Sequence, residues 1–107
     1  MTRISIFYPQ TTGSRFDFRY YTDTHMPLAI RLLSAHPGYR GVSVERGLSY
    51  PGSGTIAAYV AMCHFQFESA EAFMAAFAPH AATLQADIPN YTDIAPVIQL
   101  SEILLSQ

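Results

Sequence analysis

Apolar and polar residues alternate along four short segments of the chain, as they do in β-strands with one buried face. The first segment consists mainly of β-branched and aromatic residues, which favour strands. The third is the most apolar of the four. We therefore predict strands over residues 3–8 ("RISIFY"), 39–48 ("YRGVSVERGL"), 59–67 ("YVAMCHFQF") and 96–105 ("PVIQLSEILL").

Two further segments carry apolar residues every three or four positions, which is typical of a helix with one buried side. Asp17 can cap the first helix, which is expected to begin at Phe18 and to end before His36, because Pro37 and Gly38 follow. Ser69 can cap the second helix, which Pro79 should break into two segments. The residues on the expected inner faces are Phe18, Tyr21, His25, Leu28 and Leu32 in the first helix, and Phe73, Ala76, Phe77, His80 and Leu84 in the second.

The elements follow the order β-α-β-β-α-β, with no linker and no repeat. We therefore predict one domain over residues 1–107 with an α+β, ferredoxin-like fold, in which two helices cover one face of a four-stranded antiparallel sheet. The other face lacks cover, and the chain has only six basic and eight acidic side chains. We therefore expect two copies to pair through their sheet faces as a homodimer.

Composition argues against several classes of partner. The formal net charge is −2 and the basic residues form no cluster, which disfavours nucleic acid. No apolar run is long enough to span a membrane, and residues 1–10 lack the apolar core of a signal peptide. Cys63 is the single cysteine and has no intrachain disulfide partner, so a reducing, cytoplasmic location is expected.

The motifs of common cofactor and metal sites are also missing. There is no Gly-rich phosphate loop, no GxGxxG sequence, and no pair of histidines or cysteines at the usual metal-site spacings. Cys63 lies among apolar neighbours, which disfavours the thiolate that a nucleophilic cysteine needs. We therefore predict that the protein uses neither a metal nor a cofactor.

Two histidines close to prolines are the leading candidates for chemistry. His25 lies two residues before Pro27, His80 directly follows Pro79, and both fall on the expected inner helix faces. Because both helices cover the same sheet face, the two rings could meet in one space. His80 would lie in the first turn of a new helical segment, where exposed N–H groups favour a neutral ring that can accept a proton. The alternative, that both are hydrogen-bonded core residues, stays open.

Other candidates surround this expected space. Tyr21 could donate its hydroxyl group, and Tyr91 lies in the turn before the last strand, where it could close one end of a cavity. Phe77 and Leu28 would contact an apolar substrate. His64 would line the cavity if its side of the third strand faced the helices, which the sequence leaves open.

Several polar neighbours have simpler interpretations. Tyr20 is expected to face solvent or a partner, on the side opposite Tyr21. Asp23 and Asp93 could orient a histidine, but each also fits a solvated or capping acid. For Asn90, turn formation is the simpler interpretation.

The segments "FDFRYYTDTHMPLAIRLL", "GVSVERGL" and "AFMAAFAPHAATLQADIPNYTDIAPVIQLSEIL" resemble the EthD-type family of small dimeric α/β-barrel proteins. The resemblance implies a ferredoxin-like fold and a dimer whose two sheets form a barrel. The founding member is associated with ethyl tert-butyl ether degradation. Relatives in the wider group include polyketide cyclases, cofactor-free monooxygenases and an isomerase type, several of which move protons with a His and a Tyr. His25, His80 and Tyr21 match the family's motif positions.

Two functions are consistent with these observations. In the first, a small apolar carbonyl compound enters a cleft between helices and sheet, His80 removes an α-proton, and His25 or Tyr21 donates a hydrogen bond to the developing enolate. The outcome would be cofactor-independent isomerisation, cyclisation or oxygenation, in the degradation of ethers or other xenobiotics. In the second, the protein binds a small hydrophobic ligand without catalysis, as an accessory to an oxygenase system.

Overall fold

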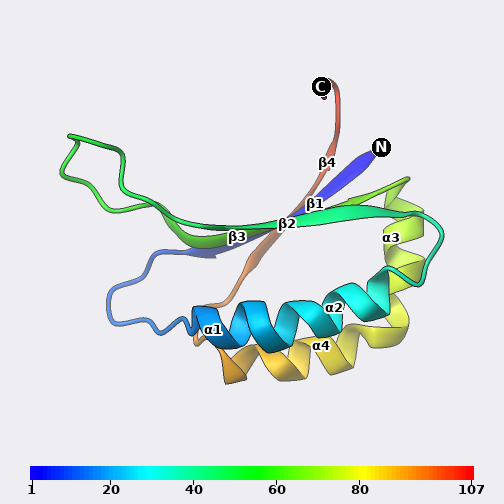
Figure 1. Ribbon diagram of the computed structural model, residues 1–107, viewed down its shortest axis with the longest axis horizontal. Coiled ribbons are helices and arrows are strands. Elements are labelled where there is room, and N and C mark those ends of the chain that lie inside the picture. The colour runs from blue at the N-terminus through cyan, green and yellow to red at the C-terminus, as the bar shows by residue number, and fades with distance from the viewer.

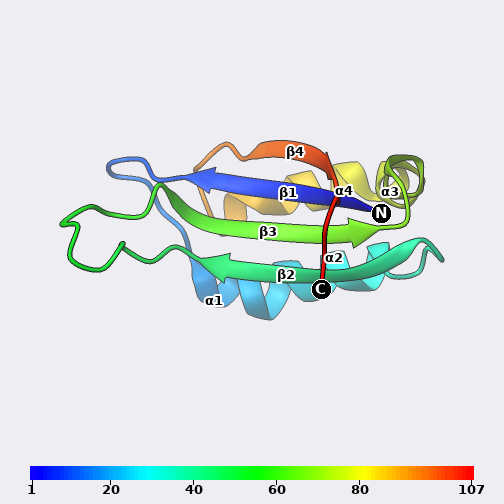
Figure 2. The same cartoon turned by 90° about the horizontal axis from the view of Figure 1, so that it is seen from above.

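The four predicted strands form one antiparallel sheet in the computed structural model, which covers residues 1–107. The strands are β1 (Thr2–Pro9), β2 (Tyr39–Arg46), β3 (Tyr59–Phe67) and β4 (Val97–Glu102). Their order across the sheet is β2-β3-β1-β4, so β1 and β3 are the central strands (Figure 2). Each pair of neighbours is antiparallel.

All helices lie on one face of this sheet and leave the other face open (Figure 1). No helix has both the length and the apolar character to cross a membrane. The predicted β-α-β-β-α-β order and the ferredoxin-like fold are therefore confirmed. The helices are α1 (Phe18–Tyr20), α2 (Met26–Leu33), α3 (Ala70–Phe77) and α4 (Ala81–Asp87). A π-helical turn (Tyr21–His25) joins α1 to α2, and a 3₁₀ turn (Ala78–His80) joins α3 to α4. A second 3₁₀ turn (Ile88–Asn90) follows α4.

The predicted helix caps are both present. The Asp17 carboxylate accepts a hydrogen bond from the Tyr20 backbone N–H at 3.1 Å, and the Ser69 hydroxyl oxygen accepts one from the Ala72 N–H at 3.0 Å. Pro79 breaks the second helix as expected, because the chain tightens into a 3₁₀ turn there. α3 and α4 consequently run in different directions, and α4 lies alongside α2 (Figure 1).

The register of the strands decides which side chains face the helices. Ile6 of β1 pairs with Cys63 of β3 and Ile98 of β4, and these residues face the helices. Ser5, one position earlier, pairs with His64 and points to the open face, since side chains alternate along a strand. His64 therefore lies on the side of the sheet away from the helices.

After His25, the inner face of the first helix is made of other residues than predicted. Met26, Ala29 and Leu33 are buried, whereas the predicted Leu28 and Leu32 are only partly so. The cause is the π-helical turn, in which the Met26 N–H donates to the carbonyl of Tyr21, five residues back. This wider turn holds one residue more and shifts the helix face that follows it.

Candidate active site

A cavity of about 490 Å³ lies between the sheet and the helices. Its volume is within the range of small-molecule sites. Of the 20 residues that line it, 17 are hydrophobic, so any ligand must be largely apolar. The lining residues are Ile4, Ile6, Tyr8, Tyr21, His25, Met26, Ala29, Leu33, Cys63, Phe65, Phe73, Met74, Phe77, Leu84, Gln85, Ile88, Tyr91, Pro96, Ile98 and Leu100.

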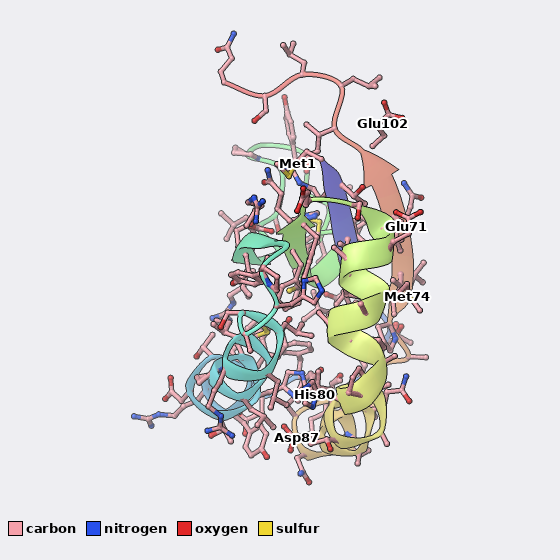
Figure 3. All side chains as sticks on the ribbon, turned by 90° about the vertical axis from the view of Figure 1, so that its right-hand side faces the viewer. Met1, Glu71, Met74, His80, Asp87 and Glu102 are labelled. Carbon is pink, nitrogen blue, oxygen red and sulfur yellow. The ribbon has the colours of Figure 1, made fainter.

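The cavity has an accessible apolar side and a buried polar end. Met74 of α3 and Ile98 and Leu100 of β4 remain about half exposed, at 52%, 55% and 43%. Figure 3 views this side, with Met74 on α3 next to β4. Tyr21 and Tyr91, at the other end, are at most 1% exposed. A ligand would therefore enter between α3 and β4 and place its leading end against the tyrosines.

The π-helical turn places His25 at this polar end. Pro27 has no N–H to donate, so the backbone is free to widen just before it. His25 is 7% exposed, and its imidazole ring stacks on Tyr21, with ring centres 5.8 Å apart and an interplanar angle of 14°. Tyr91 packs against it at 4.6 Å between ring centres. Aromatic packing on two sides therefore fixes the orientation of the ring.

Asp87 is the direct polar partner of His25. The His25 Nδ1 atom lies 2.9 Å from Asp87 Oδ2. The other carboxylate oxygen, Oδ1, accepts hydrogen bonds from the Tyr20 hydroxyl at 2.6 Å and the Asn90 amide at 2.9 Å. Burial alone would raise the pKa of Asp87, but the hydrogen bonds from Tyr20, Asn90 and His25 together hold that pKa below its ordinary value. Asp87 is therefore an ionised acceptor that orients the His25 ring.

Tyrosine hydroxyls continue the network on the other side of His25. The Tyr91 hydroxyl lies 3.5 Å from His25 Nε2 and 2.7 Å from the Tyr8 hydroxyl. Burial raises the pKa of Tyr8, Tyr21 and Tyr91 above the ordinary value for tyrosine, so all three stay protonated near neutral pH. Catalytic hydrogen bonds are commonly long before a ligand binds, and the 3.5 Å separation falls in that class.

Cys63 lines the same cavity, but its thiol is not suited to act as a nucleophile. Burial raises the pKa of its thiol to about 12, against a hydrogen bond from Tyr21 that lowers it. The thiolate, which is the reactive form, is therefore scarce near neutral pH. This agrees with the expectation from the sequence that Cys63 is not a nucleophile.

The structure brings four of the predicted site residues to the cavity and leaves three outside. His25, Tyr21, Tyr91 and Phe77 line it, while His80, His64 and Leu28 do not. The roles of all seven residues stay predictions. The prediction that the His25 and His80 rings could meet in one cavity is wrong, because His80 does not line it.

The path of α4 explains the position of His80. His80 directly precedes α4 and Asp87 ends it, about 10 Å further along the helix axis. Figure 3 shows His80 where α3 ends, with Asp87 beyond it. His25 contacts the Asp87 end of α4, so the turn at Pro79 holds His80 at the opposite end.

His64 and Leu28 are excluded for different reasons. On the open face of the sheet, His64 Nδ1 lies 2.8 Å from the Ser5 hydroxyl, and Nε2 lies 3.4 Å from Glu45. Leu28 turns away from the cavity because the π-helical turn brings Ala29 inward instead.

Three residues of the site went unrecognised in the sequence. Asp87 orients His25, the role considered for Asp23 and Asp93. Asp23 is instead exposed, and the Asp93 carboxylate accepts a hydrogen bond from the Arg15 backbone N–H. Tyr20, expected to face outward, instead binds Asp87, and Tyr8 reaches the cavity from β1. One signal was available: an acid in the last turn of a helix is disfavoured by the helix dipole, which suggests a specific partner.

No group of three or more His, Cys, Asp or Glu residues is placed to hold a metal ion. The prediction that the protein works without metal or cofactor stays a prediction.

Comparison with known proteins identifies the family. The model of the EthD domain matches residues 10–95, which includes the π-helical turn, Asp87 and Tyr91. The chain belongs to the EthD family. The resemblance seen in the sequence is thereby confirmed, and the related structures are consistent with the dimeric α/β-barrel superfamily.

One solved structure supports the EthD assignment, and a second shares the fold. An EthD-like protein from Ralstonia eutropha JMP134 is 44% identical, with 99% of this chain and 94% of that chain covered and a TM-score of 0.91. An EthD family protein from Bacillus halodurans C-125 is 18% identical, with 97% and 99% covered and a TM-score of 0.67.

A more distant solved structure shares only its fold with this protein. SnoaB, a cofactor-independent oxygenase from Streptomyces nogalater, is 14% identical, with 98% of this chain and 93% of that chain covered and a TM-score of 0.56. No curated protein matches the chain.

Proposed function

We propose that the protein is a cofactor-independent acid–base enzyme that acts on a small, neutral, apolar carbonyl compound. The reaction would be an isomerisation, a cyclisation or an oxygenation. The observation that carries this proposal is the 2.9 Å contact between His25 Nδ1 and Asp87 at the buried end of an apolar cavity. A carboxylate behind a histidine fixes its tautomer and stabilises the protonated ring that forms during proton transfer.

His25 is the base in this proposal. An ionised carboxylate only accepts hydrogen bonds, so Nδ1 carries the hydrogen when the ring is neutral. The lone pair of Nε2 is then free on the tyrosine side of the ring. This role replaces the one expected for His80, which lies outside the cavity.

The buried tyrosines would stabilise the oxyanion of the substrate. Abstraction of an α-proton leaves negative charge on the carbonyl oxygen. Tyr21 and Tyr91 hold neutral hydroxyl groups in an apolar wall, where a hydrogen bond to that charge is stronger than in water. Tyr21 thereby keeps its predicted role as donor.

Binding without catalysis is the second candidate, favoured by the hydrophobic lining. A cavity with 17 hydrophobic residues out of 20 can retain an apolar ligand whether or not a reaction follows. The protein would then serve as an accessory to an oxygenase. A branched alkyl ether is neutral and apolar, so the ether-degradation context of the family name fits the same cavity.

Hydrogen–deuterium exchange separates the two functions. A panel of neutral ketones and β-diketones is incubated with the protein in D₂O, and NMR follows both binding and the loss of α-proton signals. We expect the protein to accelerate exchange of the compounds that bind, above the rate in buffer alone. Binding without faster exchange would favour the accessory role, and a panel without any binder would contradict both.

We further propose that the protein is a homodimer formed through the open face of the sheet. Val97, Phe7 and Met62 form an apolar row across β4, β1 and β3 on that face. Tyr59, 39% exposed, extends the row by packing on Phe7. A row of this kind on the uncovered side of a sheet is typical of an interface between subunits.

Substitution of Phe7→Glu is expected to convert the dimer to a folded monomer, because it places a charge in the centre of the buried row. Light scattering after size exclusion gives the mass, and circular dichroism reports the fold. Ala82→Glu, at an exposed position of α4, is the matched control and should stay dimeric. A wild-type monomer, or a dimer that persists in a folded Phe7→Glu protein, would refute this interface.

A further inference from the structure

The most exposed large apolar side chains of the molecule lie on two segments, the β2–β3 hairpin (residues 47–58) and the C-terminal segment (residues 103–107). They are Leu48 (82% exposed), Tyr50 (77%), Ile56 (71%), Leu104 (86%) and Leu105 (83%). Every other large apolar side chain is at most 55% exposed. Single exposed leucines are ordinary in proteins, but a concentration of them on two segments indicates a contact surface.

Both segments project from the open side of the sheet. In Figure 1 the hairpin extends beyond the sheet and bends away from the helices, and the C-terminal segment rises on the same side. Figure 2 shows that the C-terminal segment crosses the strands nearer to the start of β1, while the hairpin lies at the opposite end. A second copy that stacks on the open face would therefore lie between the two segments.

The base of the hairpin is anchored to the sheet on both sides. The Gly47 N–H donates to the Val60 carbonyl at 2.8 Å, and the Gln10 N–H donates to the Ala58 carbonyl at 2.9 Å. A Cβ atom at Gly47 would collide with the backbone carbonyl of Tyr59, so glycine is required where the two legs meet. The hairpin is therefore held in line with β2 and β3, and its apolar side chains extend beyond the sheet.

The apolar row of the open face is too small for a permanent dimer interface. Such interfaces bury at least about 1,000 Å² on each subunit, of which about 65% is apolar. The row has four side chains, none more than 53% exposed, so it offers at most about 400 Å². The hairpin can supply the missing area, because Tyr59 directly follows it and packs on Phe7 in the row.

The position of the row indicates how the two copies are oriented. Val97, Phe7, Met62 and Glu45 lie at one level across the four strands. A two-fold axis along the strands keeps this level and stacks the row on its own copy. Because the strand order is β2-β3-β1-β4, the same axis places β2 of one copy opposite β4 of the other. The hairpin, which continues β2, then reaches the start of the partner's β4.

We propose that the β2–β3 hairpin packs against the start of β4 in a second copy of this chain and borders the mouth of that copy's cavity. β4 is an edge strand, and Val97 and Ile98, on its two sides, are 53% and 55% exposed. An exposed apolar edge invites unwanted strand pairing unless it is covered. Ile98 and Pro96 line the cavity, so a hairpin at this place would become part of its mouth. The inference rests on the proposed dimer and adds the partner's contribution to the site.

Intermolecular paramagnetic broadening tests this placement. Ser49→Cys carries a nitroxide label on the hairpin and is mixed, without isotope enrichment, with ¹⁵N-enriched wild-type protein, so that only mixed dimers show broadened signals. Cys63 is fully buried, and burial raises the pKa of its thiol to about 12, so the label reacts with the new cysteine. We expect the strongest broadening at the amide signals of Val97 and Ile98. A label on Ala82→Cys, at an exposed position of α4, is the matched control and should broaden both far less.

Ile56→Glu tests whether the hairpin contact stabilises the dimer. The side chain is 71% exposed in one copy, so the variant should keep its fold, but in the dimer it places a charge in an apolar contact. We expect the dissociation constant of the dimer to rise about ten- to hundredfold, as for a buried contact residue. Sedimentation over a dilution series measures this constant, and Ala82→Glu should keep the wild-type value.

Three results would overturn the inference. The first is strongest broadening at Arg3 and Gln66, at the other end of the sheet, which would mean that the axis runs across the strands. The second is a mixed dimer without broadening, and the third is a folded Ile56→Glu protein that dimerises as tightly as the wild type. None of the three would remove the sheet-face dimer or the acid–base function, because Phe7→Glu and ketone exchange test those separately. A wild-type monomer would remove this inference together with the dimer.

Discussion

Replacement of His25 by glutamine is expected to slow α-proton exchange of a bound ketone by a factor on the order of 10² to 10⁴, the usual contribution of a general base. Glutamine has a similar length and keeps polar atoms near Asp87, but it cannot take up a proton near neutral pH. The cavity wall otherwise stays intact. NMR in D₂O measures the exchange rate of the variant beside that of the wild-type protein.

The same substitution at His80 provides the matched control. His80 lies outside the cavity, so His80→Gln should exchange at close to the wild-type rate. The sequence alone assigns the base to His80, and on that assignment His80→Gln would slow the exchange. A His25→Gln protein that is folded, binds the ketone and keeps the wild-type exchange rate would rule out His25 as the base.

Asp87→Asn is expected to lower the exchange rate by a comparable factor, although Asp87 does not contact the ligand. Tyr20 and Asn90 both donate to Oδ1, so the amide oxygen of the new asparagine stays on their side. Its NH₂ group then faces His25 Nδ1, which must accept instead of donate. The ring hydrogen moves to Nε2, and the lone pair that takes the proton is lost.

Asp23→Asn is the control for this prediction, since Asp23 is exposed and makes only a 3.9 Å ion pair with Arg19. It should leave the exchange rate unchanged. If Asp87→Asn kept both its fold and the wild-type rate, the carboxylate would have no positioning role, and the proposal would lose the observation on which it rests.

The fold could be predicted from the sequence because its signals are local. Alternation marked the four strands, and Asp17 and Ser69 marked the helix starts with side chains that bind their own backbone. Pro79 marked the break in the second helix by removing an N–H group. Each of these signals acts within a few residues.

The site could be predicted only in part because its partners are distant in sequence. His25 and Asp87 are 62 residues apart, and Tyr8 and Tyr91 are 83 apart. Pro27 stands near His25 in the sequence, but it does not by itself predict a π-helical turn that shifts the inner face from Leu28 to Ala29. The position of His80 depends on the angle between α3 and α4, which the spacing of apolar residues along the sequence does not predict.

The central claim is that Asp87 fixes the His25 ring with its lone pair on Nε2. Long-range ¹H–¹⁵N NMR of the histidine rings tests it in the wild-type protein without any substrate, with assignment by loss of the His25 signals in His25→Gln. We expect the neutral His25 ring to carry its hydrogen on Nδ1, bonded to Asp87, and the ring of Asp87→Asn to carry it on Nε2. A wild-type ring with its hydrogen on Nε2 would contradict the account, because no base would then face the cavity.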